Sequence, residues 1–122
     1  MNLTPSAMNK DYSIQINKKI IINEKGKFTQ LCISKILYIY CDGYISSIKT
    51  KDEETRTARL LKEFEIELKD LCFFRVNRNT LVNMTHIHSY INYNKPTIVL
   101  TDGEAINISK RRLSNFLRLF KK

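Results

Sequence analysis

Two Asp-Gly dipeptides, at residues 42–43 and 102–103, each lie between two runs of β-branched, aromatic and aliphatic residues. Asp-Gly in this setting is a strong signal for a β-hairpin, because a tight type I′ turn needs positive φ at both central positions. Two further pairs of apolar runs are separated by turn signals, one at the glycine of IIINEKGKFTQLCI and one around Asn94 to Pro96. The chain is therefore predicted to be mainly β, built from successive antiparallel hairpins.

The run from Ile36 to Cys41 is largely apolar in both alternate sets of side chains, as expected of a central strand that is covered on both faces. Two other segments have the helical period, and we expect each to pack an apolar stripe on the sheets. These stripes are Leu60, Leu61, Phe64 and Leu68 in LLKEFEIEL, and Leu113, Phe116, Leu117 and Phe120 in SKRRLSNFLRLF. The first helix also carries three glutamates, which would repel phosphate, so it is not expected to face a polyanion.

A length of 122 residues, with 43% apolar and 27% charged residues, fits one soluble globular domain. No apolar run approaches the length of a membrane span, and the first residues lack the apolar core of a signal peptide, so we expect a cytoplasmic protein. The three cysteines are odd in number and set among apolar residues, so free thiols are expected. They are Cys32, Cys41 and Cys72.

The formal net charge of +9 is concentrated in the last 48 residues, where nine Lys or Arg stand against two Asp or Glu. Clustering of this kind favours a polyanionic partner, either nucleic acid or an anionic membrane surface. The alternative is a set of solvated basic side chains with no partner, and composition alone does not separate the two interpretations.

Residues 73–83, FFRVNRNTLVN, contain two arginines and three asparagines but no acidic residue. We expect a compact loop or single turn that is fixed by its apolar residues and leaves its polar side chains free. Arg and Asn are suited to bidentate contacts with guanine and adenine, so Asn77, Arg78 and Asn79 are candidate readers of base edges. Asn also serves turns and caps, which is our interpretation of Asn83 and an equal alternative for Asn79.

Ser109 is predicted to cap the second helix, with its hydroxyl accepting from a backbone N–H of the first turn. The next residues, Lys110 to Arg112, are all cationic and oppose the helix dipole, at a cost of about a few tenths of a kcal/mol each. Three cations at a helix N-terminus form a good phosphate site, and Arg can also reach guanine in the major groove. The alternative is a solvated first turn whose basic residues are incidental.

Four segments, in this order, resemble the LytTR DNA-binding domain of bacterial transcription regulators: ISKILYIYCDGY, LLKEFEIEL, FFRVNRNTLVNMTHIHSY and IVLTDGEAINISKRRLSNFL. The resemblance runs from about Ile20 to Phe120. Its most specific parts are the phenylalanine-arginine block that ends in Val82-Asn83 and the Ser-Lys-Arg-Arg after the final hairpin. It implies an elongated arrangement of short antiparallel sheets with one or two short helices.

In that family, loops rather than a recognition helix enter successive major grooves on one side of the duplex and bend it. The resemblance therefore implies sequence-specific binding of double-stranded DNA for transcription regulation, without a cofactor and without enzymatic activity. The implied DNA-binding residues are Tyr44, Asn77, Arg78, Asn79, Lys110, Arg111 and Arg112. Family members occupy direct repeats as paired copies, so a homodimer on promoter DNA is a further expectation, although no dimer surface is identifiable in the sequence.

The chain departs from the family pattern at two places. Where this chain has Asn77 to Asn79, the family commonly has His, then a basic or amide residue, then Ser. At the position of Tyr40, the family commonly has Glu. These changes leave the target sequence open. Residues 1–13 are interpreted as a flexible leader or linker remnant and residues 14–122 as the DNA-binding domain. The chain is expected to be either a stand-alone regulator or a fragment of a longer one.

Three other interpretations remain. A basic β domain could bind single-stranded nucleic acid or RNA by stacking bases on exposed tyrosines, for which Tyr12, Tyr90 and Tyr93 are the candidates. A protein-interaction module could use the basic surface to bind an acidic partner. His86 and His88 are spaced to share one face of a strand, but no supporting Cys or carboxylate makes a metal site of them. No catalytic motif is present.

Overall fold

The computed structural model describes residues 17–121, so the predicted leader, residues 1–13, lies outside the described residues. The first half of the described chain contains β1 (Lys19–Glu24), β2 (Lys27–Cys32), the 3₁₀ turn η1 (Ile33–Lys35), β3 (Ile36–Asp42), β4 (Ile45–Thr50), β5 (Glu54–Thr57) and helix α2 (Leu61–Glu67). The second half contains β6 (Phe73–Asn77), β7 (Thr80–Asn83), the 3₁₀ turn η2 (Met84–His86), β8 (Ile87–Ile91), β9 (Thr97–Leu100), β10 (Ala105–Asn107) and helix α3 (Lys110–Phe120).

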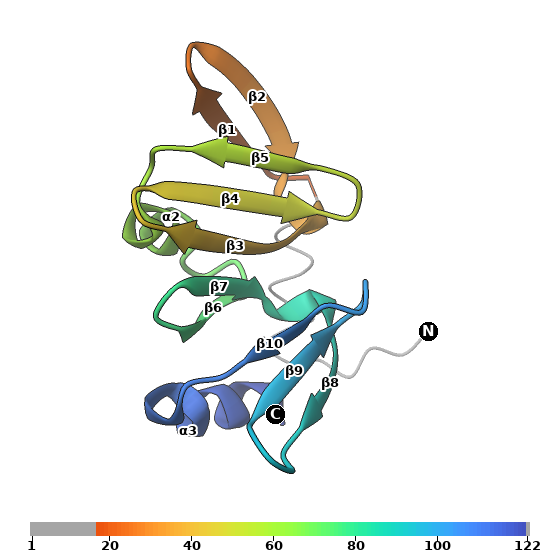
Figure 1. Cartoon of the computed structure of the whole chain (residues 1–122). Coiled ribbons are helices and arrows are strands. Elements are labelled where there is room, and N and C mark those ends of the chain that lie inside the picture. Colours follow the sequence, from red (N-terminus) through yellow and green to blue (C-terminus); the bar gives the residue numbers. More distant parts are fainter. Residues whose placement is uncertain (1–16, 122) are drawn as a thin grey trace.

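The strands form three antiparallel sheets, which follow one another along the molecule (Figure 1). A two-stranded ribbon of β1 and β2 lies at one end, and a five-stranded sheet in the order β5-β4-β3-β7-β6 occupies the middle. A three-stranded sheet in the order β10-β9-β8 lies at the other end beside α3. The predicted fold class, a mainly β arrangement of short antiparallel sheets with two short helices, is confirmed.

Strand β3 is the middle strand of the five-stranded sheet, as predicted, and its side chains enter two different hydrophobic cores. Ile36 and Ile39 belong to the first core, which lies among β1, β2, α2 and the five-stranded sheet. Leu37 belongs to the second core, among β6, β7, the three-stranded sheet and α3. The two apolar sets of this strand are therefore explained by burial on both faces.

The hairpins form where the turn signals predicted them, but the type I′ geometry appears at only one of the three glycine turns. Lys25 and Gly26 both have positive φ, 52° and 89°, as a type I′ turn requires. In the β3–β4 hairpin Asp42 pairs with Ile45, so the turn residues are Gly43, with φ 66°, and Tyr44. At Asp102-Gly103 only the glycine has positive φ. An Asp-Gly signal thus located these hairpins without fixing the turn type.

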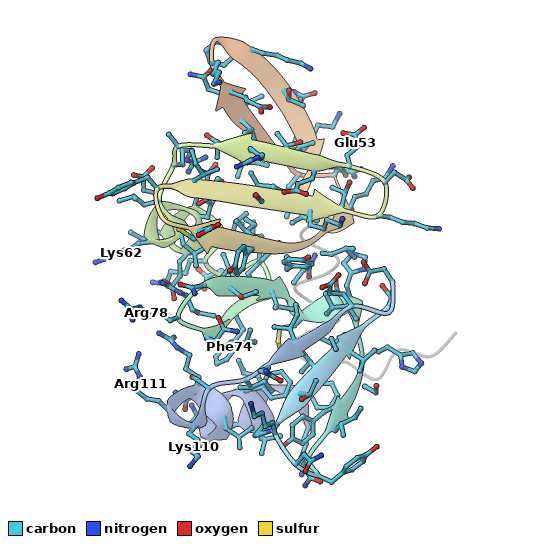
Figure 2. All side chains as sticks on the ribbon, viewed as in Figure 1. Glu53, Lys62, Phe74, Arg78, Lys110 and Arg111 are labelled. Atoms are coloured by element: carbon cyan, nitrogen blue, oxygen red, sulfur yellow. The ribbon has the colours of Figure 1, made fainter. Side chains whose placement is uncertain are left out.

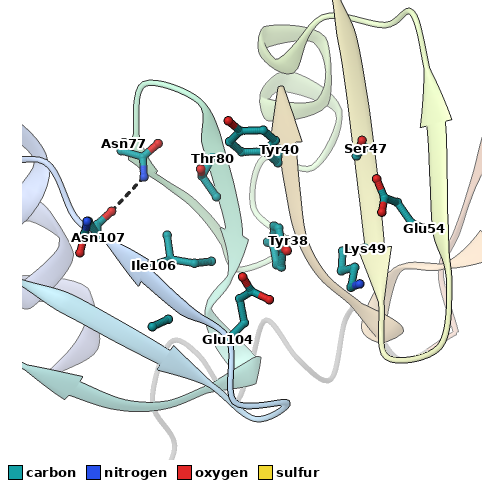
Figure 3. A pocket seen from close by; sticks show the side chains of 11 residues that line it. Tyr38, Tyr40, Ser47, Lys49, Glu54, Asn77, Thr80, Glu104, Ile106 and Asn107 are labelled. Atoms are coloured by element: carbon teal, nitrogen blue, oxygen red, sulfur yellow. Dashed lines mark hydrogen bonds between the residues drawn. The ribbon is translucent and has the colours of Figure 1, made fainter. Parts of the chain in front are cut away.

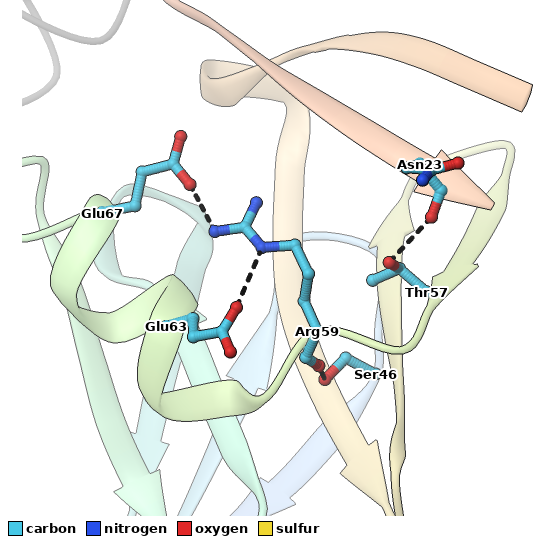
Figure 4. A network of polar contacts seen from close by, with 6 residues as sticks. All are labelled: Asn23, Ser46, Thr57, Arg59, Glu63 and Glu67. Carbon is cyan, nitrogen blue, oxygen red and sulfur yellow. Dashed lines mark hydrogen bonds and ion pairs between the residues drawn. The ribbon is translucent and has the colours of Figure 1, made fainter. Parts of the chain in front are cut away.

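Helix α2 buries Leu61, Phe64 and Leu68 as predicted, whereas the prediction was wrong for Leu60, which precedes the helix and is exposed. A polar network holds the helix to the strands (Figure 4). The Arg59 guanidinium lies 4.1 Å from the centre of the Phe64 ring and forms ion pairs with Glu63 and Glu67. Two of the three helix glutamates are therefore neutralised within the fold.

The prediction that the cysteines form no disulfide bridges with one another is confirmed. The expectation that His86 and His88 share one face of a strand was wrong, because His86 ends η2 and only His88 lies on strand β8. The Nε2 atom of His86 lies 2.7 Å from the carbonyl oxygen of Ser34, so this ring packs against the backbone. Among residues 17–121, no group of three His, Cys, Asp or Glu side chains is arranged to hold a metal ion. No helix in this range is long and apolar enough to cross a membrane.

Candidate nucleic-acid interface

The FFRVNRNTLVN block forms the β6–β7 hairpin, which corrects the prediction of a compact loop or single turn. Val76, Leu81 and Val82 are buried in the two cores and fix both strands. Asn77 pairs with Thr80, so Arg78 and Asn79 are the two residues of a tight turn. The local sequence folds in this way because the apolar residues of both strands are buried in the cores, while the polar residues lie at the turn.

A β-bulge at Val76 joins this hairpin to helix α3. The ladder pairs Arg75 with Leu81 and then Asn77 with Thr80, so Val76 is the extra residue on β6. Its carbonyl oxygen accepts a hydrogen bond from the backbone N–H of Ser109, at 2.9 Å. The start of α3 is therefore fixed beside the end of β6.

The backbone of the Arg78–Asn79 turn is held by three hydrogen bonds from outside the turn. Arg75 Nη2 donates to the carbonyl oxygen of Arg78 at 2.6 Å, and the N–H of Cys41 donates to the carbonyl oxygen of Asn79 at 2.9 Å. The N–H of Asn79 donates to Asn77 Oδ1 at 2.9 Å. The side chains of Arg78 and Asn79 are exposed, and neither has an ion-pair or hydrogen-bond partner in the described part of the chain.

Asn77 and Asn83 are engaged within the protein. The amide of Asn77 uses Oδ1 for Asn79 and donates Nδ2 to the carbonyl oxygen of Asn107 at 2.9 Å. Asn83 is completely buried, donates to the carbonyl oxygen of Ile36 and accepts from the N–H of Thr85 at the start of η2. The capping interpretation of Asn83 is confirmed, and Asn77 has one amide hydrogen left for a ligand.

Helix α3 begins at Lys110 after Ser109, but the predicted side-chain cap is absent. The Ser109 hydroxyl makes no capping bond, and although its oxygen is buried, it has no hydrogen-bond partner among residues 17–121. Lys110 and Arg111 are exposed, whereas Arg112 is partly buried. Burial, together with the charges of Arg111 and Arg75, lowers the pKa of the Arg112 guanidinium, and Glu65 opposes this effect.

Tyr44 occupies the β3–β4 turn and is 83% exposed. Strands β3 and β7 are antiparallel, with Tyr40 opposite Thr80, so the β3–β4 turn and the β6–β7 turn lie at the same edge of the five-stranded sheet. The bond between Ser109 and Val76 adds the start of α3 to this edge. The structure thus brings the three predicted elements together along one side, where Arg78 and Arg111 are seen in Figure 2.

Lys62 lies on the same side and was missed by sequence reasoning (Figure 2). It lines a cleft of about 460 Å³ together with Gly43, Arg75, Arg78 and Asn79, between the two hairpin turns and α2. The three glutamates of α2 were weighed as one acidic surface, yet Glu63 and Glu67 pair with Arg59 and Glu65 pairs with Arg75. The spacing of Arg59 and Glu63, four residues apart, was a sequence signal for the first of these ion pairs.

A second recess of about 410 Å³ lies between the five-stranded sheet and β10 (Figure 3). Tyr38, Tyr40, Lys49, Glu54 and Glu104 are among its lining residues. Burial raises the pKa of the Tyr38 hydroxyl, and the carboxylates of Glu104, Asp102 and Glu54 add to that effect. This acidic surrounding is unsuited to a phosphate, unlike the edge that carries Arg78.

Comparison with known proteins gives consistent results. Residues 26–121 match the family model described as the LytTr DNA-binding domain. The chain is 25% identical over 111 residues to the sensory transduction protein LytR of Staphylococcus haemolyticus (strain JCSC1435), in an alignment that covers 88% of this chain and 38% of that protein. It therefore spans well under half of the length of this relative.

A solved structure has a similar fold. It is described as the LytTr DNA-binding domain of a putative methyl-accepting/DNA response regulator from Bacillus cereus. The TM-score is 0.75 with 19% sequence identity, and the alignment covers 87% of this chain and 99% of that one. The arrangement of sheets and helices described above is thus found in a second protein.

Proposed function

This chain belongs to the LytTR DNA-binding domain family, and we propose from that premise that it binds specific sequences of double-stranded DNA to regulate bacterial transcription. The observation that carries the proposal is the alignment of three elements along one edge: the turn with Tyr44, the turn with Arg78 and Asn79, and the first turn of α3. Loops on one side of a domain can enter successive major grooves of one face of the duplex, and we propose that they do so and bend it.

The proposed DNA-binding side chains fall into two groups, those that contact base edges and those that contact phosphates. Arg78 and Asn79 are free at the turn, so Arg78 is proposed to bind guanine O6 and N7 and Asn79 to bind adenine. Lys110, Arg111 and Lys62 are proposed to hold phosphates, as is Arg112 in part, and Arg111 is also long enough to reach a base edge. Asn77 is proposed to contact DNA through its one remaining amide hydrogen, while Tyr44 contacts the groove at the other end of the row.

The partner and setting follow from the same premise. We propose that the DNA sites are direct repeats in promoters and that two copies occupy them as a homodimer on DNA. We propose that the protein works in the cytoplasm and uses no cofactor. Because the family is one of DNA-binding domains, we also propose no enzymatic activity.

The rival interpretation, a binder of single strands, is less well supported. It needs exposed tyrosines as stacking platforms. Tyr90 instead packs on Phe116 and Phe120, with ring centres 5.8 Å and 6.3 Å apart. Tyr93 is exposed, and Tyr12 lies outside the described residues. Of these three candidates, only Tyr93 is therefore seen to be exposed among the described residues. The other exposed tyrosines, Tyr40 and Tyr44, belong to the five-stranded sheet and form no row with it.

The test is selection from a random duplex library at near-physiological salt, with free single strands as competitor. We expect a short motif to be enriched, with repeats about one helical turn apart. Duplexes retained without enrichment would make the basic edge a general binder of polyanions. Preferential capture of the single strand would favour the stacking interpretation, and absence of binding to either would favour an acidic protein partner.

A further inference from the structure

We propose that Arg75 is a positioning residue that fixes the turn carrying Arg78, so that it governs base discrimination without contacting DNA. The inference rests on the proposed function. At the level of sequence, Arg75 is one more cation in a basic block and a natural candidate for a phosphate contact. Its contacts in the fold assign it another role.

The guanidinium of Arg75 bridges two elements. Its Nη1 lies 3.0 Å from Glu65 Oε1 on α2, and its Nη2 donates to the carbonyl oxygen of Arg78 at 2.6 Å. The Arg75 side chain is only 21% exposed. Charge-assisted hydrogen bonds of this kind are stronger than neutral ones, and a planar guanidinium holds its two acceptors in a fixed relative geometry.

This bridge bonds the carbonyl oxygen of Arg78, for which Arg75 is the partner. Asn79 is held by Cys41 and by Asn77, whereas the carbonyl of Arg78 is held by Arg75. A bidentate contact with guanine needs the Arg78 side chain to leave the turn in one direction, and a loop fixed in its bound conformation loses less entropy on binding. Fixing this carbonyl therefore sharpens the contact that Arg78 makes.

The pairing with Glu65 also distinguishes Arg75 from the cations that are proposed to attract DNA, because it compensates the charge of Arg75. Its charge is compensated within 3.0 Å, while Arg78 has no carboxylate within 4.0 Å in the described range. Arg59 supplies a matched comparison, because it too pairs with glutamates of α2, but it bonds to no atom of the turn (Figure 4).

The test compares discrimination, measured as the ratio of Kd for a selected duplex to Kd for the duplex altered at the base that Arg78 reads. The variant Arg75→Met with Glu65→Gln removes both partners and leaves the net charge unchanged. We expect its discrimination to fall about tenfold, within the range set by one bidentate base contact, while its affinity for random duplex stays within about threefold. The matched control, Arg59→Met with Glu67→Gln, should keep discrimination within about twofold, since Arg59 bonds to no atom of the Arg78–Asn79 turn.

Coupling with Arg78 supplies the second readout. If Arg75 acts through Arg78, the variant pair adds no further loss of discrimination in an Arg78→Ala background. If the losses of discrimination add in full, Arg75 contacts DNA itself. If the double variant Arg75→Met with Glu65→Gln discriminates as well as the wild type, the bridge has no role in discrimination. Either result overturns the inference. Arg75→Lys, which keeps the charge but lacks the fork, should lose discrimination about threefold and serves where the pair does not fold.

The outcome also separates this inference from the function on which it rests. A wild-type chain that shows no discrimination between duplexes overturns both. A wild-type chain that discriminates, with a variant pair that discriminates equally well, overturns only the role of Arg75. Far-UV circular dichroism of each variant establishes that the compared chains are folded.

Discussion

Arg78 and Lys110 carry the same charge on the same edge, but their supports differ. Arg78 extends from a turn whose two carbonyls and one N–H are bonded by neighbouring residues, so its side chain leaves from a fixed point. Lys110 lies on the first turn of α3, is exposed, and has a flexible stem. A fixed planar guanidinium suits base reading, and a mobile ammonium suits attraction to phosphate.

We therefore expect Arg78→Ala and Lys110→Ala to produce different defects. Arg78→Ala should cost about 1 to 3 kcal/mol on the best site and relax preference at one base pair. Lys110→Ala should weaken binding to all duplexes and lower the salt slope by about one unit. Fluorescence anisotropy with selected and random duplexes over a series of salt concentrations measures both, and equal losses on the two duplexes for both variants would contradict the division.

Sequence reasoning identified Arg78 and Asn79 from their chemical type, and both side chains are free in the structure. It could not show how fully Asn77 and Arg75 are engaged, because each has one partner that is remote in sequence besides a partner within the same hairpin. Asn107 is 30 residues from Asn77, and Glu65 is 10 residues from Arg75. It placed Asn83 correctly because its partner Thr85 is only two residues away.

At the scale of elements, α3 depends on one aromatic cluster. Phe116 is completely buried, and its ring centre lies 6.1 Å from that of Phe74 and 5.3 Å from that of Phe120. This ring joins the helix to β6 and β8, so the orientation of the basic first turn depends on it.

Phe116→Ala is expected to lower the free energy of unfolding by roughly 3 to 5 kcal/mol, because it leaves a large cavity beneath the helix. Urea denaturation followed by circular dichroism measures the change. Leu119→Ala is the control on the same helix, since Leu119 is 38% exposed and its loss should cost less than about 1 kcal/mol. Similar losses for the two variants would show that the cluster does not anchor α3.

Most elements were predictable because their apolar residues recur at a regular period. Strand β6 could not be predicted, since the bulge interrupts that period. The bulge at Val76 places one extra residue between Arg75 and Asn77, so the alternation expected of a strand is lost over these positions. The same bulge frees the carbonyl that receives Ser109, which explains why the local irregularity lies next to α3. The alternating pattern that indicates a strand is thus interrupted at the place where β6 is bonded to the start of α3.

At the scale of the whole molecule, the two cores share strands. On β3, Leu37 enters the second core while Ile36 and Ile39 enter the first; on β7, Leu81 enters the first and Val82 the second. Neither core can lose its packing without disturbing a strand that supports the other.

We therefore expect the domain to unfold in one cooperative transition, although it contains three separate sheets. Far-UV circular dichroism and tyrosine fluorescence should give coincident urea curves. Two resolved transitions, with the signal of the three-stranded sheet lost at a lower urea concentration, would show that the shared strands do not couple the cores.

The order of strands in the middle sheet was beyond reasoning from local patterns, because β3 pairs with β7 across some forty residues of chain. That pairing places the turns with Tyr44 and Arg78 at one edge. Hairpins arise from short-range signals, whereas the common edge arises from this long-range pairing. The family resemblance implied only that the loops reach one side of the duplex.

The turn at Arg78 and Asn79 has a consequence for how such regulators diverge. Its shape is maintained by Arg75, Cys41 and Asn77, none of which needs the side chain of either turn residue. Under the proposed function, replacement at these two positions would therefore alter the DNA sequence that is recognised without destabilising the fold. A descendant gene could acquire new targets by one or two codon changes, and selection would act on recognition almost independently of stability.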